Sequence, residues 1–335
     1  KIINSIRSEN KQYSKIDNST LMAIFSARNA INMSGWRKLE NIGISIGSSR
    51  GATRAWEKSY DMMLLKGKVL PITSPITTMG NLSSWVSQDL SIEGPTISHS
   101  MTCTSGLHAI ANGLAWLKSN MCNKFLCGAT EDPLTSFTYK QFEALGLYTK
   151  NKDFKFPCRP FAKEQIKQNT LVLGQGSAVF ALEKYNDHHF KHIIAKIAGI
   201  GLTVDKITTM TSISKNGVGL EKSMLIALED AQLNDVDAII AHAPGTIYGD
   251  SSELNAIYRV FGDSNHPIIL SNKWLIGHTL GASVSLSLEL AIHILHNQNY
   301  MDFPYRSHFN TKFKKINKIM INAAGFGGNC GSVII

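Results

Sequence analysis

Two short candidate strands with an amphipathic helix between them constrain the fold of this chain most strongly. The candidate strands cover residues 96–100 and 124–127, and a helix is expected over 105–118 because its apolar residues repeat at helical spacing. A strand, a helix and a second strand in this order form a βαβ unit, whose two strands lie parallel in one sheet. The sequence therefore predicts an α/β protein.

The same alternation continues on both sides of this unit. After Tyr185 the pattern restarts without a linker rich in Pro, Gly or Ser, which predicts two α/β halves, residues 1–185 and 186–335, packed as one body. The first half should also contain a capped helix over 18–33 and a buried strand over 42–46. In the second half, strands are expected over 193–200, 238–241, 267–270 and 318–323, and helices over 220–231, 252–261 and 284–296.

Composition narrows the class of protein. Of the 335 residues, 43% are hydrophobic and 18% are charged, which is typical of a soluble globular chain with a large core. The 34 Lys and Arg exceed the 25 Asp and Glu by a net charge of +9, which favours an acidic partner. Nucleic acid, an anionic membrane surface and an acidic carrier protein all remain open at this point.

Location and metal binding can be judged from a few segments. Residues 274–295 are long and apolar but contain Gly277, His278 and Glu289, so a core helix is expected rather than a membrane span. Five cysteines, an odd number without framework spacing, and a polar start without a signal peptide predict a cytoplasmic protein. Cys122 and Cys127 have no second Cys or His pair nearby, so no metal site is expected.

Cys103 is the sharpest candidate for chemistry. It follows a predicted strand and immediately precedes the predicted helix, in Thr-Cys-Thr-Ser-Gly. The positive field of a helix N-terminus lowers the pKa of a thiol and favours the nucleophilic thiolate. An isolated cysteine at this place is more often a small buried residue, so the position alone does not establish a nucleophile.

Two histidines occupy equivalent places in the second half. His242 ends an apolar strand and enters a loop, and His278 also follows a strand. Ligands bind at strand ends in α/β sheets, so one cysteine and two histidines at such ends favour a catalytic cluster. Near the C-terminus, Asn-Ala-Ala-Gly-Phe-Gly-Gly-Asn (322–329) could form an oxyanion site or a tight surface turn; it lacks a dinucleotide-binding spacing.

Taken together and in this order, these segments resemble the β-ketoacyl-acyl-carrier-protein synthases, the elongating condensing enzymes of the thiolase superfamily. The resemblance implies a thiolase-like layered αβαβα arrangement of two similar halves. It extends from about residue 19 to the C-terminus. The matching motifs are Cys103 before a helix, His242 running into Gly249-Asp250-x-x-Glu253, Lys273-x-x-x-Gly277-His278, Gly325-Phe326-Gly327-Gly328, Cys158-Arg159-Pro160-Phe161 and Leu173-Gly174-Gln175-Gly176.

The resemblance also implies roles for the matched residues. Cys103 would accept an acyl chain as a thioester, and His242 and His278 would promote decarboxylation of a malonyl unit and stabilise the enolate. Lys273 would support His278 electrostatically. The backbone N–H groups of Cys103 and Phe326 would form the oxyanion hole, Phe326 would gate the acyl pocket, and Thr246, Gly327 and Gly328 would contact the substrate.

Several positions depart from the family pattern. Pro244 replaces one of two hydroxyl residues expected near the phosphopantetheine arm, and Gln175 replaces an acidic residue. Ser287 stands where a carboxylate is usual, so Lys273 is expected to have another partner. Ala324 replaces a phenylalanine, which should open space beside the pocket. The family's opening strand is not visible before Asn18.

The expected function is decarboxylative Claisen condensation of malonyl-ACP with a Cys-bound acyl chain, in fatty acid, polyene or polyketide biosynthesis. The alternative is a catalytically silent subunit like a chain-length factor; such subunits typically lack the nucleophilic cysteine that this chain has. A degradative thiolase is disfavoured because Cys330 does not sit in a Cys-x-Gly motif. The resemblance implies an acyl carrier protein as partner and a homodimer or heterodimer with a related subunit, with no nucleic acid, metal or further cofactor.

Overall fold

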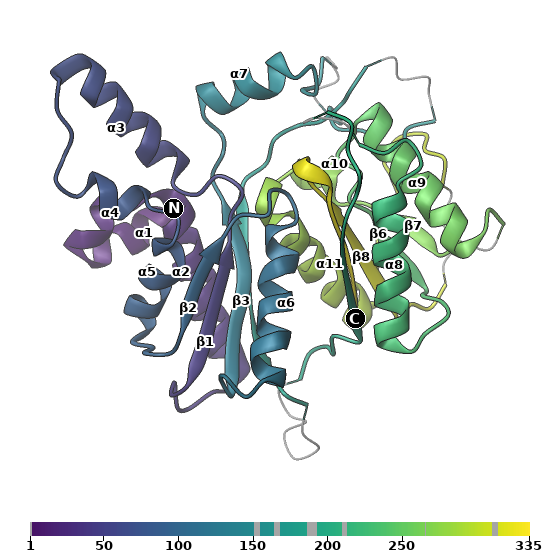
Figure 1. Cartoon of the computed structure of the whole chain (residues 1–335), viewed down its shortest axis with the longest axis horizontal. Coiled ribbons are helices and arrows are strands. Elements are labelled where there is room, and N and C mark those ends of the chain that lie inside the picture. Colours follow the sequence, from purple (N-terminus) through teal and green to yellow (C-terminus); the bar gives the residue numbers. More distant parts are fainter. Residues whose placement is uncertain are drawn as a thin grey trace.

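Helix α6 (Ser105–Lys118) runs through the middle of the molecule, between two β-sheets (Figure 1). The computed structural model describes residues 2–150, 155–163, 168–185, 193–209, 213–264, 266–309 and 314–335. Helix α6 packs on the first sheet through β1 (Ile42–Gly47) and β3 (Lys124–Glu131). It also contacts α11 (Ser283–Asn297) beside it and β9 (Asn329–Ile334) of the second sheet.

The first sheet has four strands in the order β2-β1-β3-β4. Strands β1, β2 (Thr96–His99) and β3 are parallel, and β4 (Gly176–Glu183) pairs antiparallel with β3. Helices α2 (Asn18–Ser34) and α5 (Asn81–Leu90) cover its outer face. Asp17 caps α2 by accepting the Ser19 N–H at 2.9 Å. The predicted βαβ unit is therefore confirmed, with β1 lying between its two strands.

The second sheet has five strands in the order β5-β9-β8-β6-β7. Strands β6 (Ala238–Ile240), β7 (Ile268–Leu270) and β8 (Ile319–Ala324) are parallel, whereas β9 pairs antiparallel with both β8 and β5 (Gly199–Val204). Helix α8 (Val218–Ala231) covers the outer face and packs against α9 (Ile247–Phe261). Helices and sheets thus alternate in five layers, which confirms the predicted αβαβα arrangement.

The remaining helices are short or lie at the periphery of the two sheets. Helix α3 (Thr53–Lys66) projects from the body and carries exposed apolar side chains, including Trp56 and Leu65 (Figure 1). Helix α7 (Ser136–Ala144) lies over the end of the first sheet. The others are α1 (Ile2–Glu9), α4 (Thr73–Thr77), α10 (Lys273–Ile276) and 3-10 turns at Lys11–Lys15, Leu280–Ala282 and Phe326–Gly328.

Some expected boundaries are wrong. The strand expected over 193–200 begins only at Gly199. Gly199 and Gly201 let α8 pack closely on this strand: a Cβ on Gly201 would lie 2.1 Å from the Ser223 carbonyl oxygen. Helix α9 begins at Ile247, five residues earlier than expected. The single core helix expected over 274–295 is interrupted after α10 at Gly277, whose φ is +73°.

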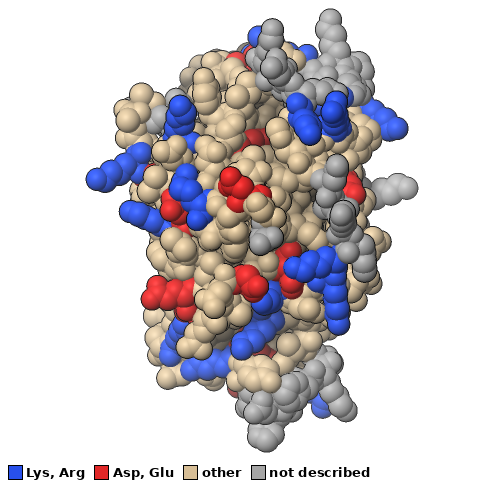
Figure 2. Space-filling view, turned by 90° about the vertical axis from the view of Figure 1, so that its right-hand side faces the viewer, with Lys and Arg blue, Asp and Glu red and all other residues tan. Residues whose placement is uncertain are grey.

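Each sheet uses strands from one half of the sequence only. The division into 1–185 and 186–335 stays a prediction, and residues 186–192 at the boundary lie outside the described residues. Positive and negative side chains are interspersed on the face shown in Figure 2, so the surplus of positive charge forms no single-sign patch there. Among the described residues, no helix has the length and apolar character needed to cross a membrane.

Candidate active site

Cys103 lies in a tight turn between β2 and α6, buried at the meeting point of the two sheets. The turn is held in a conformation that is unusual for a non-glycine residue, because Thr102 has φ of +53°. The Thr102 Oγ1 donates a hydrogen bond to the Phe326 carbonyl oxygen at 3.2 Å, and the Met101 N–H donates to Ser105 Oγ at 2.9 Å. These bonds fix the sulfur beside the glycine-rich loop.

His278 approaches Cys103 from the break between α10 and α11. Its Nε2 lies 3.2 Å from Cys103 Sγ, and its Nδ1 lies 3.0 Å from Ser283 Oγ. The backbone is fixed as well, since the His278 N–H donates to the Val172 carbonyl at 2.7 Å. The interruption of the expected helix is therefore what places this imidazole against the sulfur.

His242 completes the group, after the end of β6. Its ring lies 5.1 Å from the His278 ring, centroid to centroid, at an interplanar angle of 89°. Its Nδ1 is buried and has no hydrogen-bond partner among the described residues. A buried polar atom without a partner is uncommon. The structure thus brings together the three side chains that the sequence singled out.

Two carboxylates, for which the sequence predicted no role, hold the His242 loop. Glu253 accepts the backbone N–H groups of His242 and Ala243 at 2.9 and 2.8 Å. Asp250 accepts those of Gly245 and Thr246, both at 3.1 Å. Both acids belong to α9, whose early start at Ile247 puts them under the loop. Their spacing within the Gly-Asp-x-x-Glu motif was the signal that could have revealed this role.

Burial controls the protonation of the site. It raises the pKa of the Cys103 thiol to about 12, with a further increase from Glu131, and it lowers the pKa of His278 to about 3. The pKa of His242 is also well below its ordinary value, because of burial and the charges of His278 and Lys273. In the free protein the rise in the Cys103 pKa caused by burial outweighs the lowering expected from the helix N-terminus, and near pH 7 the thiol and the two imidazoles are neutral.

Lys273, the first residue of α10, is buried five residues before His278. Its Nζ donates to Asn272 Oδ1 at 3.0 Å, and Ser287 Oγ donates to the same oxygen at 3.4 Å. Burial lowers the pKa of Lys273 to about 8, although Glu253 opposes this shift. Lys273 therefore has the other partner that was expected, and Ser287 shares that partner.

A cavity of about 470 Å³ opens beside Cys103. Phe326, 39% exposed, forms part of its wall. Gly325 lets the glycine-rich loop approach, since a Cβ there would lie 2.2 Å from Thr102 Oγ1 and 3.1 Å from the Cys103 nitrogen. The residues lining the cavity are Ser49, Arg50, Cys103, Gln141, Phe142, Ala144, Leu145, Leu280 and Phe326.

Other predicted substrate-binding residues lie elsewhere. Thr246 lines a separate hollow of about 140 Å³ together with Arg159 and His308, and Gly327 and Gly328 are not among the residues lining the larger cavity. Ala324 does not open space beside that cavity: it is buried in the core of the second half, opposite Cys330 across β8 and β9. The substrate contacts expected at Thr246, Gly327 and Gly328 stay predictions.

Glu131, at the end of β3, holds another part of the cavity wall. Its carboxylate accepts hydrogen bonds from the Ser49 N–H, from Ser48 Oγ at 3.0 Å and from the Arg50 N–H at 3.2 Å. Burial raises its pKa to about 7. The sequence signal that could have revealed this residue is an acid directly after an apolar run and before Asp-Pro.

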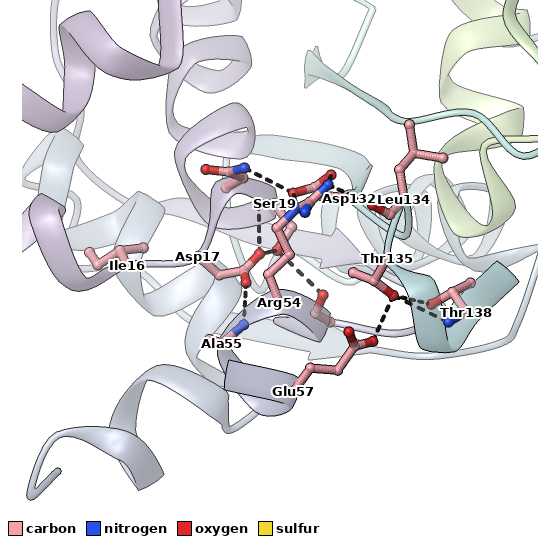
Figure 3. Close-up of polar contacts among 12 residues, drawn as sticks. Ile16, Asp17, Ser19, Arg54, Ala55, Glu57, Asp132, Leu134, Thr135 and Thr138 are labelled. Carbon is pink, nitrogen blue, oxygen red and sulfur yellow. Dashed lines mark hydrogen bonds and ion pairs between the residues drawn. The ribbon is translucent and has the colours of Figure 1, made fainter. Parts of the chain in front are cut away.

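A polar network next to Glu131 fixes helix α7 over the cavity (Figure 3). Arg54 pairs with Asp132 and donates to the Leu134 carbonyl at 2.8 Å. Thr135 donates to Glu57 on α3 at 2.6 Å and caps α7 by accepting the Thr138 N–H at 3.2 Å. The helix that supplies Gln141 and Phe142 to the cavity is thereby tied to α3 and to the end of β3.

All five cysteines are buried and free. Within the described ranges, no group of three or more His, Cys, Asp or Glu side chains could hold a metal ion. The site therefore consists of a thiol, two imidazoles and a buried ammonium, with carboxylates that act on the backbone around them. A thiol and neutral imidazoles of this kind suit acyl transfer through a thioester.

Comparison with known proteins identifies the family. The β-ketoacyl synthase N-terminal domain matches residues 5–188 and the C-terminal domain matches 194–303. Nodulation protein E of Rhizobium sp. (strain N33) is 32% identical over 295 residues, covering 84% of this chain and 70% of that protein. The 3-oxoacyl-[acyl-carrier-protein] synthase 2 of Staphylococcus aureus is 29% identical over 286 residues, covering 82% of this chain and 70% of that protein.

Solved structures of similar fold include synthases of the same family. A β-ketoacyl synthase from Burkholderia phymatum STM815 has a TM-score of 0.84 and 25% identity, covering 97% of this chain and 83% of that one. The ishigamide ketosynthase/chain length factor has a TM-score of 0.83 at 22% identity, covering 96% and 82%. The chain belongs to the β-ketoacyl synthase family. It is a condensing enzyme of the acyltransferase type.

Proposed function

We propose that this enzyme joins a Cys103-bound acyl chain to a malonyl unit with loss of CO2. The contact of 3.2 Å between Cys103 Sγ and His278 Nε2 carries the proposal. In the first step Cys103 Sγ attacks the acyl thioester, the bond from the acyl carbon to the donor sulfur breaks, and the thiol proton of Cys103 leaves with the released donor thiol. The product of this step is an acyl-enzyme thioester.

In the second step the malonyl carboxylate leaves as CO2, and the electron pair of the broken bond forms an enolate. His278 Nδ1 lies 3.0 Å from Ser283 Oγ, and in the tautomer in which Nδ1 accepts from this hydroxyl, the Nε2–H group can donate a hydrogen bond to the enolate oxygen. His242 provides the second donor. The enolate carbon then attacks the acyl carbonyl, the bond to Cys103 Sγ breaks, and one proton from solvent restores the thiol.

Neutral imidazoles suit this chemistry. A protonated imidazole would give up its proton to an enolate, whereas a neutral imidazole N–H can stabilise the negative charge by hydrogen bonding. Burial and the charge of Lys273 lower the pKa of His278 to about 3, which keeps the ring neutral. In this role Lys273 sets the electrostatic environment, and the N–H groups of Cys103 and Phe326 form the oxyanion hole.

The substrates are proposed to arrive on the phosphopantetheine arm of an acyl carrier protein. A ketosynthase of similar fold, AntDE, has been solved in complex with its acyl-carrier protein. We also propose a dimer, because β2 is an edge strand of the first sheet and leads directly into the Cys103 turn. The mass of the protein in solution, measured by light scattering, would test this; a monomer at working concentration would contradict it.

Separate measurements of the two half-reactions test the function. Cys103→Ala should abolish the mass increase that octanoyl-pantetheine produces on the intact protein, and Cys127→Ala, at a buried cysteine of β3, should keep it. His278→Ala should slow CO2 release from malonyl-pantetheine by about 10²–10³, the usual cost of losing one oxyanion donor. Acylation of Cys103→Ala, or no CO2 release by the parent, would overturn the proposal, and the second result would favour a silent partner subunit.

A further inference from the structure

The wall of the Cys103 cavity contains one positive charge, Arg50. This residue follows β1 and lines the cavity together with the apolar side chains of Phe142 and Leu280. Among the described residues, no carboxylate lies within 4.0 Å of its guanidinium nitrogens. Glu131 accepts the backbone N–H of Arg50, and its carboxylate interacts electrostatically with the guanidinium without forming an ion pair. Among the described residues, the guanidinium thus has no directly paired carboxylate.

The guanidinium also has hydrogen-bonding capacity to spare. Its Nη2 donates to Gln141 Oε1 on α7 at 2.6 Å, a bond that joins two walls of the cavity. Its Nε is buried and has no partner in the described chain. A guanidinium offers five N–H donors, and this one hydrogen bond cannot satisfy them. Unpaired donors in a partly closed cavity favour a ligand with acceptor oxygens.

A plain alkyl chain would be a poor occupant of such a cavity. It would displace water from the guanidinium without replacing the lost hydrogen bonds, which is costly for a charged group. An acyl chain with a carbonyl or carboxylate oxygen at the right distance would replace them. Arg also binds carboxylates in a bidentate manner that fixes their orientation.

We infer that Arg50, with Gln141, selects acyl chains that carry a carbonyl or carboxylate oxygen beyond the thioester carbonyl. The inference rests on the proposed function, since the acyl chain is the one attached to Cys103. Arg50 acts as a specificity-determining residue, and the substrate class is an oxygenated acyl thioester rather than a saturated hydrocarbon chain.

The test is the rate of acylation of Cys103, followed by intact-protein mass, for matched sets of pantetheine thioesters. Each set contains a saturated acyl chain, the ω-oxo chain and the ω-carboxy chain of the same length, from four to ten carbons. The parent enzyme should prefer an oxygenated chain by about ten-fold or more at one length, the ratio expected for a hydrogen bond to a charged group. Comparing the ω-oxo and ω-carboxy arms shows which oxygen is bound.

Arg50→Met, which keeps an unbranched apolar stem and removes the guanidinium donors, should abolish that preference, and Arg50→Lys should retain part of it. Arg259→Met, on α9 and paired with Glu221, is the matched control and should leave the preference unchanged. A parent enzyme that prefers saturated chains at every length would overturn the inference without any variant. So would an Arg50→Met variant that acylates like the parent but loses malonyl decarboxylation. Equal acylation of Cys103 by the saturated and the oxygenated chains would overturn this inference and leave the proposed function intact.

Discussion

Replacing the Glu253 carboxylate tests how the His242 imidazole is held. Glu253 accepts the N–H groups of His242 and Ala243 at 2.9 and 2.8 Å and the Asn322 Nδ2 at 3.2 Å, and all of these groups are buried. In Glu253→Gln the side chain offers one acceptor oxygen where the carboxylate offered two. At least one backbone N–H then faces an NH2 group instead of an acceptor.

Leaving a buried donor without a partner costs about 1–3 kcal/mol. We expect Glu253→Gln to lower the free energy of unfolding by about that amount and Glu253→Ala, which removes all three hydrogen bonds, to lower it further. Because the loop then no longer fixes His242, CO2 release from malonyl-pantetheine should fall by about 10²–10³. Acylation of Cys103 should change much less, since Cys103 contacts His278 rather than this loop.

Urea unfolding and the two half-reactions, measured on the same preparations, provide the assay. Glu221→Gln is the matched control: Glu221 is also a glutamate on a helix, but its partner is the Arg259 side chain and it is partly exposed, so the change should alter stability by less than about 0.5 kcal/mol. If Glu253→Gln keeps both the parent stability and the parent decarboxylation rate, the carboxylate does not position the loop.

Two further predictions concern Glu131 and Ala324. Burial raises the pKa of Glu131 from 4.5 to about 7, so the folded state binds this proton more tightly than the unfolded chain does; its stabilising contribution is present below about pH 4.5 and is lost as the pH rises through about 7. That shift corresponds to about 3 kcal/mol. The unfolding free energy of the parent should therefore fall between pH 5 and 8, and in Glu131→Gln this fall should be smaller by part of that amount. An unchanged dependence of stability on pH would contradict the prediction. Ala324→Phe should destabilise the protein by about 1–3 kcal/mol through overpacking, without changing the preference of Cys103 for acyl chain length; a stable variant with a shifted preference would show that Ala324 borders the acyl chain after all.

Much of the candidate active site was predictable from the sequence because its thiol and two imidazoles lie at strand-to-helix transitions. The apolar periodicity of α6 and the short runs at β2 and β6 place Cys103 and His242 at such transitions. The hydrogen-bond partners of the loops around the site were not predictable in this way. That Glu253 accepts two N–H groups, or that Lys273 donates to Asn272, depends on how the loops pack.

Strand β9 was not among the strands expected from the sequence, and its composition explains why. Strand β9 contains a cysteine and Gly331 and follows a glycine-rich turn, a composition that favours a loop over a strand. In the structure a Cβ on Gly331 would lie 2.1 Å from Leu107 Cδ2, so the glycine is needed for α6 to approach the sheet. Tertiary packing therefore overrides local strand propensity here.

The position of β9 between β5 and β8 has a consequence for the order of folding. During synthesis the first sheet can form from residues 42–183, whereas β5 must wait for residues 329–334 before it gains its neighbour. Until then β5 presents unpaired backbone groups, the kind of strand edge that recruits other chains. Cys103 and His278, 175 residues apart, meet only when both sheets are complete. Ribosome-bound intermediates would therefore be inactive and prone to aggregate, and fragments that end before residue 329 should need a chaperone to remain in solution.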